Sequence, residues 1–216
     1  MANKIKKIFG ISLALLLLAG ISVGISANHE TGKAGAIFSY EIEKSGSTLK
    51  SNVAPHNIWK WSQWRNGVLV KEWYHTNLTT TEGRTHMLNT EFHGGAAEAT
   101  WYIMLFESDS TPLESWTYDL LADSLVTECT AYDEANRVAY NEAEAAAASM
   151  TNSANKATFT MNDTKTIYGA CLVSLNTKSD HTAGDYVYSA GTFGTAASVE
   201  SGDVLKITLV LSLSDV

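Results

Sequence analysis

The order of apolar and polar residues along the chain predicts several strands. Residues 204–216 (VLKITLVLSLSDV) alternate cleanly, and residues 156–163 (KATFTMND) alternate over a shorter length. Alternation places apolar side chains on one face of a strand and polar side chains on the other. The runs at 100–108 (TWYIMLFES) and 166–176 (TIYGACLVSLN) are almost continuously apolar, which indicates strands buried on both faces.

The stretch WKWSQWRNGVLVKEW, residues 59–73, predicts a β-hairpin. Asn66 and Gly67 stand at its centre, and a type I′ turn needs positive φ at both central positions, which Asn and Gly tolerate best. Trp59 and Trp61 are two residues apart, so they share one face of the first strand. Four of the six tryptophans lie in this stretch, which makes the hairpin the first candidate for a functional surface.

Helical patterns are short. Residues 79–92 offer threonine N-caps and apolar residues at helical spacing, and residues 113–128 offer a second apolar stripe. Residues 141–150 (NEAEAAAASM) have a helix-forming composition without such a stripe. Gly191-Thr-Phe-Gly194 does not open a helix, so it is interpreted as a loop and not as a dinucleotide motif. Short strands between turn signals, with one or two short helices, predict a mainly β fold, an antiparallel β-sandwich.

The chain divides into three predicted parts. Residues 1–27 have a basic start and a long uncharged run, which is typical of a signal peptide or an N-terminal membrane anchor. Residues 28–57 predict an extended arm with one strand near 36–43, and residues 58–216 predict the β-sandwich domain. We therefore expect an exported or cell-envelope protein.

The net charge, the cysteines and the absence of known motifs restrict which ligands and reactions the sequence supports. Residues 28–216 carry twelve basic and twenty-three acidic residues, a net charge of −11, which argues against a surface that neutralises nucleic-acid phosphates. Cys129 and Cys171 either form one disulfide or are two buried thiols on separate strands. The sequence contains no His-Glu-x-x-His, Gly-x-Ser-x-Gly or Walker motif, and its histidines lack metal-site spacing. We expect no enzyme activity, no bound metal and no cofactor.

The tryptophans of the hairpin have three interpretations. Trp59, Trp61, Trp64 and Trp73 are a sugar-stacking platform, a contact with a partner subunit, or the core of the hairpin. Alternation places Trp59 and Trp61 on one face and Trp64 on the other or in the turn. One face is therefore expected to be core and the other to be partly exposed.

Several segments together resemble a widespread family of small structural proteins of tailed bacteriophages and prophages. The resemblance covers about residues 59–214 and is carried by the ordered pieces NLTTTEGRTHMLN, ATWYIMLFES, TECTAYDEANR, TNSANKATFTMNDTKTIYGACLVS, NTKSDHTAGDYVYSAGTF and VESGDVLKITLVLSLS. TAYDEANR (130–137) and NSANKATFT (152–160) are its most specific pieces. The signal-like start and the longer, more apolar LESWTYDLLADSL depart from the family pattern.

The resemblance implies a virion component, either a capsid decoration protein or a tail-associated protein, that contacts capsid or tail proteins and copies of itself. It carries over no catalytic residues. The alternative function is an exported carbohydrate-binding or adhesin module that binds a cell-surface glycan through the Trp-rich hairpin.

Asp133, Glu134 and Arg137 lie within TAYDEANR, the most specific piece. We expect Arg137 to pair with Asp133 and to fix the 129–140 loop, with Asp133 also suited to a turn. A calcium site from Asp133, Glu134 and loop carbonyls is a weaker interpretation, because the ligand spacing is irregular.

Overall fold

The computed structural model describes two units separately, residues 1–52 and 53–216. Placement is described for residues 21–24, 41–44, 53–55, 57–121, 125–180 and 184–215. In the first unit, β1 (Ile21–Gly24) pairs antiparallel with β2 (Glu41–Lys44). The other residues of the predicted signal segment, and most of the predicted arm, lie outside the described residues.

The second unit is built on one ten-stranded sheet, which confirms the prediction of a mainly antiparallel β fold. Its strand order is β3-β12-β4-β5-β11-β10-β6-β7, and β8 and β9 also pair with β12. The strands are β3 (Val53–Pro55), β4 (Asn57–Arg65), β5 (Val68–Thr79), β6 (Tyr102–Phe106), β7 (Val138–Ala139), β8 (Ser149–Thr151), β9 (Ala157–Thr160), β10 (Lys165–Val173), β11 (Val187–Val199) and β12 (Val204–Asp215). The pairings described for this unit are all antiparallel.

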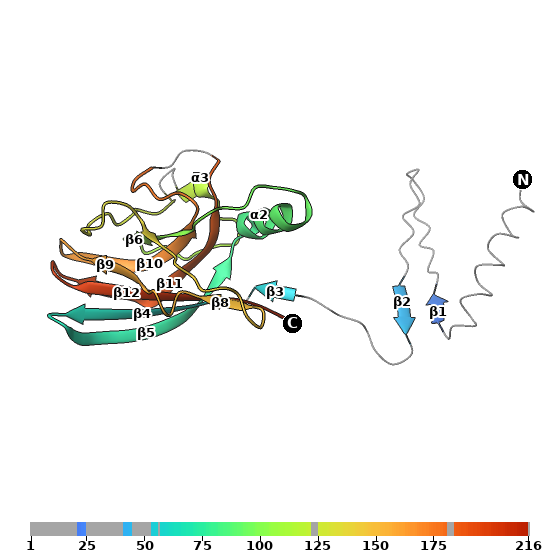
Figure 1. Cartoon of the computed structure of the whole chain (residues 1–216), viewed down its shortest axis with the longest axis horizontal. Helices are drawn as coiled ribbons and strands as arrows, with labels where there is room; N and C mark the ends of the chain where they lie inside the picture. The colour runs from blue at the N-terminus through green and yellow to red at the C-terminus, as the bar shows by residue number, and fades with distance from the viewer. Residues whose placement is uncertain are drawn as a thin grey trace, which may run out of the picture. The chain divides into compact units, whose positions relative to one another are not determined.

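The sheet curls at β5. Most of β5 pairs with β4, and only Leu78 and Thr79 pair with β11. The curl places β4 and β12 beside β10 and β11 in the ribbon (Figure 1). Buried side chains of all four strands belong to one core. Within this core, β12 contributes Leu205, Ile207 and Leu209, as the alternation predicts.

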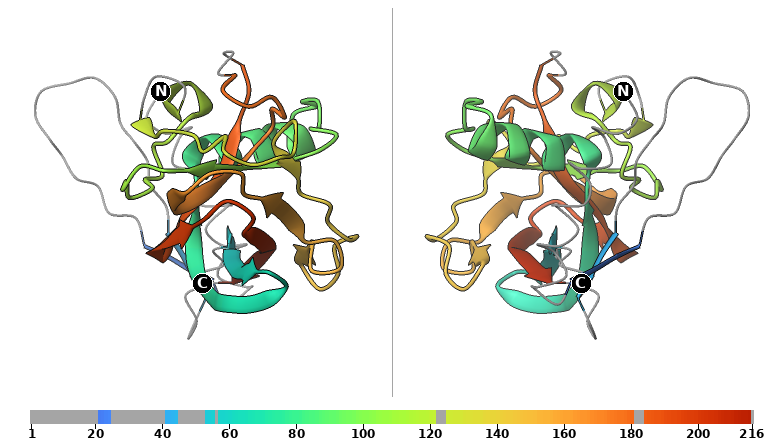
Figure 2. Two further views of the ribbon diagram at one scale, coloured as in Figure 1. Left: turned by 90° about the vertical axis from the view of Figure 1, so that its left-hand side faces the viewer. Right: turned by 90° about the vertical axis from the view of Figure 1, so that its right-hand side faces the viewer.

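A second core cluster covers the opposite face of β6 and β10. Met104 and Phe106 of β6 lie in it with Trp116 and Tyr118, whereas Leu105 belongs to the first core. Both faces of β6 are therefore buried, which confirms the interpretation of its continuous apolar run. The helices lie on one side of the unit, and the β4–β5 hairpin lies on the opposite side (Figure 2).

Helix α2 (Thr81–Phe92) confirms the helix predicted at 79–92. Thr80 is its N-cap, and its hydroxyl accepts the N–H of Gly83. Gly83 is the buried residue of the helix. A Cβ there would lie 2.5 Å from the carbonyl oxygen of Tyr188 in β11, so glycine allows the helix backbone to approach the strand closely. The apolar residues at helical spacing do not form the contact: Phe92 is 80% exposed and Leu88 is also exposed.

One predicted helix is shorter than expected, and another is not formed. In residues 113–128 the described helix is α3, Tyr118–Leu120, because Trp116 packs into the second core from irregular backbone. In residues 141–150 the chain forms a tight turn in place of a helix: Ala147 and Ala148 have positive φ, and Ala146 pairs with Ser149, where β8 begins. Pairing of β8 with β12 outweighs the helix propensity of the alanine-rich run.

The loop predicted at Gly191-Thr-Phe-Gly194 is also wrong, because these residues belong to β11. A Cβ at Gly191 would lie 2.8 Å from the Trp59 ring and 2.7 Å from Cβ of Asn77. Glycine here allows the strand to pass beneath the tryptophan, and Gly194 adopts φ +70°. The glycines that suggest a loop therefore permit close packing.

Candidate interaction surface

The hairpin forms as predicted. Asn66 (φ 50°) and Gly67 (φ 76°) make the turn between β4 and β5, and Trp61 lies opposite Trp73 across the two strands. A register shift beyond Gln63 places a bulge near the tip.

Trp59 and Trp61 are core residues. They are 0% and 1% exposed, their rings stack with centroids 5.1 Å apart, and Phe193 of β11 lies 3.7 Å from the Trp61 ring centroid. This burial corrects their assignment to an interaction surface, because alternation turns both toward β11. A sugar platform that needs these two rings is not formed.

Trp64 and Trp73 remain partly exposed. The indole of Trp64 donates to the Ser62 hydroxyl at 3.0 Å, and the Lys206 ammonium lies 4.9 Å from its ring centroid. Trp73 packs edge-on against Phe193. Of the two, Trp64 lies on the outward face, as expected for the face opposite Trp59 and Trp61.

The exposed apolar residues of β5 form a surface that the prediction based on the tryptophans does not include. Val68 and Val70 are 67% and 52% exposed, Leu69 between them is exposed, and Tyr74 is 73% exposed. Leu69 lies opposite Trp64, so the run continues onto β4. We call Val68, Leu69, Val70, Tyr74 and Trp64 the hairpin surface. The VLV run is visible in the sequence, but its exposure follows from β5 lying outside the core.

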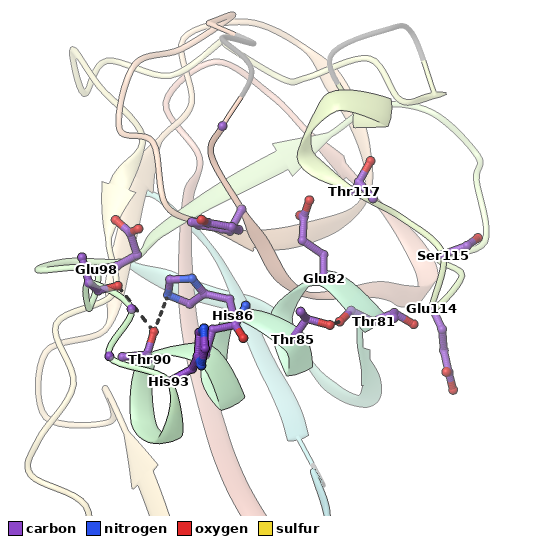
Figure 3. Close-up of a pocket in the computed structure, with 16 residues that line it drawn as sticks. Thr81, Glu82, Thr85, His86, Thr90, His93, Glu98, Glu114, Ser115 and Thr117 are labelled. Atoms are coloured by element: carbon purple, nitrogen blue, oxygen red, sulfur yellow. Dashed lines mark hydrogen bonds between the residues drawn. The ribbon is translucent and has the colours of Figure 1, made fainter.

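An open groove of about 890 Å³ runs along α2 (Figure 3). Glu82 and His86 project into it from the helix, Glu98 comes from the following loop, and Glu114 and Thr117 line the other side. We call it the α2 groove.

Glu82 connects three segments at this groove. Its carboxylate accepts the N–H of Val187 at 2.7 Å and the N–H of Tyr118 at 3.0 Å. Burial raises the pKa of Glu82, although both hydrogen bonds act to lower it. The ring of His86, one helical turn later, packs against the rings of Tyr186 and Trp101, with ring centroids 4.1 Å and 5.6 Å apart, respectively. These contacts make both side chains part of the packing of α2 against the start of β11 and the residues next to it.

Metal and membrane features were also considered for the described part of the chain. Within it, no three His, Cys, Asp or Glu side chains are grouped so that they would hold a metal ion. Each helix described is too short or too polar to cross a bilayer.

Arg137 fixes its loop through a different acid from the one expected. Its guanidinium donates to both oxygens of Glu128, each at 2.8 Å, and the two side chains are 0% and 4% exposed. It also donates to the Tyr118 hydroxyl at 2.7 Å. Asp133 is exposed and accepts from the Asn162 amide. The predicted Arg137–Asp133 pair is therefore wrong, because the loop turns Asp133 toward solvent.

Glu134 also has a structural contact, since its carboxylate accepts the N–H of Thr160 in β9 at 3.1 Å. The loop thus joins β9 through Glu134 and the second core through Arg137. TAYDEANR is a structural segment in this fold.

Cys129 and Cys171 are free and buried, so the disulfide alternative is wrong. The backbone N–H of Cys129 donates to Leu105, and Cys171 lies opposite Met104. Neighbouring residues of β6 point to opposite faces, and the two cysteines accordingly lie in different core clusters.

The sequence matches no protein-family model and no curated protein.

Proposed function

We propose that this protein is a non-enzymatic structural component of a tailed-phage or prophage virion, in the capsid decoration or tail-associated class. It acts by burying the hairpin surface against neighbouring subunits, either copies of itself or other virion proteins. We propose one alternative localisation: residues 1–27 direct export, and the protein resides in the cell envelope instead of the virion.

One observation supports this proposal most directly. Val68, Leu69 and Val70 are consecutive apolar residues, and all three are exposed at the tip of a rigid hairpin. A run of three exposed apolar residues is uncommon on the surface of a monomer and is typical of a contact with a partner. Tyr74 and Trp64 add aromatic area of the kind that is enriched at protein interfaces.

The anchoring of the hairpin also supports a contact role. Arg65 at its tip donates to both carboxylate oxygens of the buried Asp203, at 2.7 and 2.9 Å, and also pairs with Glu200. Gln63 donates to the same carboxylate at 2.7 Å. The tip is thereby held in one orientation before any partner binds, which lowers the entropic cost of association.

The sandwich architecture belongs to this proposal. Side chains of β4 and β12 pack against those of β10 and β11, so the curled sheet presents two layers around one core. We propose that this two-layer body is a β-sandwich module whose exposed hairpin is its contact element.

Gradient-purified particles from a phage-producing culture that expresses the full chain would test the function. Quantitative mass spectrometry is expected to find the chain in the particle fraction, and Leu69→Ser/Val70→Ser to reduce its incorporation at least tenfold. The matched control is Leu88→Ser/Phe92→Ser, which removes two exposed apolar side chains of α2 and is expected to leave incorporation unchanged. A wild-type chain found only outside the particles would contradict the proposal.

A further inference from the structure

Three lysines gather on the outward face of β4, β9 and β12. Lys60 lies opposite Thr208, and Lys206 lies opposite Ser62, so the two lysines are diagonal neighbours on adjacent strands. Diagonal neighbours on one face are roughly 7–8 Å apart. Lys156 directly precedes β9 and lines the same open groove of about 400 Å³. We call it the lysine groove.

The lysine groove has a hydroxyl floor and an aromatic edge. Ser62 and Thr208 lie between the lysines and are almost fully buried, and Thr151 also lines the groove. Trp64 lies beside Lys206, and Tyr74 lies opposite Lys60. The groove is therefore continuous with the hairpin surface.

The positive charge of this groove is only partly compensated within the described residues. In the second unit, each arginine, and Lys165, forms an ion pair with an acidic side chain, whereas Lys60, Lys156 and Lys206 form none, as is also true of Lys71 and Lys178. Glu72 is the one carboxylate among the lining residues described. Three ammonium groups and one carboxylate give the groove a net charge of +2 on a chain whose net charge is −8. Like charges placed side by side repel unless a counter-charge joins them.

We infer that the lysine groove binds an acidic segment of a partner protein, with its carboxylates seated between Lys60, Lys156 and Lys206. This inference rests on the proposed function and names the chemistry of the partner at the same face. Alternate side chains of an extended segment lie about 6.6–6.8 Å apart. That spacing is close to the diagonal separation of Lys60 and Lys206, so successive carboxylates of such a segment reach successive lysines.

The donors in the groove favour carboxylates of a polypeptide over phosphate. Phosphate sites commonly use free backbone N–H groups at helix N-termini or in nests. The backbone of β12 is paired with β4 on one side and with β8 and β9 on the other. The donors in the lysine groove are lysine ammonium groups and hydroxyl groups. Nucleic acid is disfavoured by the overall charge of −8, and the aromatic edge suits a protein partner.

Calorimetric titration of the full-length protein with a hexaglutamate peptide tests this inference. We expect binding at low salt that weakens as NaCl rises from about 20 to about 200 mM, because exposed charges are screened. Each lysine is expected to contribute about two- to fivefold to affinity, so Lys60→Gln/Lys206→Gln should weaken binding by roughly four- to twenty-five-fold. Lys71→Gln is the matched control, since Lys71 is also exposed but lies over Trp73 on the other face.

Absence of hexaglutamate binding, or binding that the Lys60→Gln/Lys206→Gln variant retains in full, would overturn the inference. Tighter binding of inorganic phosphate or of oligothymidylate than of hexaglutamate would also overturn it, in favour of a phosphate ligand. Incorporation into particles without hexaglutamate binding would refute the partner chemistry alone. Hexaglutamate binding by a chain that is absent from particles would refute the proposed function alone.

Discussion

Replacing Arg137 by methionine would leave a buried carboxylate without its cation. Arg137 donates two hydrogen bonds to Glu128, one to the Tyr118 hydroxyl, and others to the carbonyls of Leu175 and Asp180. In Arg137→Met, Glu128 keeps one bond, from the N–H of Ser179 at 2.9 Å. Removing one partner of a buried pair costs about 3–5 kcal/mol, since the remaining charge stays desolvated.

Urea unfolding followed by tryptophan fluorescence measures this cost. Trp116 and Tyr118 share the second core, so the signal reports on the affected region. A loss of about 3–5 kcal/mol corresponds to a fall in Tm of roughly 6–20 °C for a domain of this size. Glu128→Gln keeps an acceptor for the guanidinium and is expected to cost less.

The double variant Arg137→Met/Glu128→Met provides the decisive comparison. It removes both charges and fills the space with apolar side chains, so we expect it to be more stable than Arg137→Met alone. Refutation would come from Arg137→Met lying within about 1 kcal/mol of wild type, or from the double variant losing the sum of both single costs.

Three further predictions follow from buried contacts. Gly191→Ala should lower the free energy of unfolding by about 1–3 kcal/mol in urea melts, because the added Cβ meets Trp59 and Asn77; an unchanged midpoint would contradict this packing. The Arg65 hydrogen bond lowers the pKa of Asp203 from 3.8 to about 2. The ionised Asp203 therefore adds about 2 kcal/mol to the free energy of unfolding above about pH 4, and this contribution is lost as pH falls through 2. In Asp203→Asn this acid-dependent loss should vanish from urea melts across that range, and its persistence would exclude Asp203 as the source. Burial raises the pKa of the Cys129 thiol to about 12 and also raises the pKa of Cys171. A thiol reagent should therefore label neither cysteine in the native protein and both in guanidinium. A disulfide would block labelling in both states.

The sequence predicts those elements whose signal is local. Asn66-Gly67 specifies its turn through backbone conformations that few other residues adopt. Alternation in 204–216 and in 156–163 identifies the buried faces of β12 and β9, because these strands have one face on the core. The short helix at 79–92 is recognised by its threonine cap, although its exposed Phe92 would mislead any prediction of how it packs.

The remainder depends on contacts distant in sequence. Glycine within β11 indicates a loop until Trp59 is known to lie above Gly191. The composition of residues 141–150 favours a helix, but the pairing of β8 with β12 decides the structure of this segment. Arg137 has a nearer acid in sequence than Glu128, and only the turn of the loop decides between them.

The same limit applies to the interaction surface. Trp59 and Trp61 are two residues apart and share the buried face, whereas the exposed residues of β5 look in sequence like an ordinary buried strand. Lys60 and Lys206 become neighbours only through the pairing of β4 with β12. The candidate surface therefore follows from tertiary pairing and not from any motif.

The position of β12 in the sheet also governs the order in which the protein folds during synthesis. Strand β4 is translated early, but residues 204–210 that pair with it emerge roughly 145 residues later. At about 5–20 residues per second, that interval lasts roughly 7–30 s. Throughout it, Trp59 and Trp61 lack the strand that lies beside them in the native sheet. The nascent chain should therefore depend on chaperones more than its size suggests, and slow codons before β12 should lower its soluble yield.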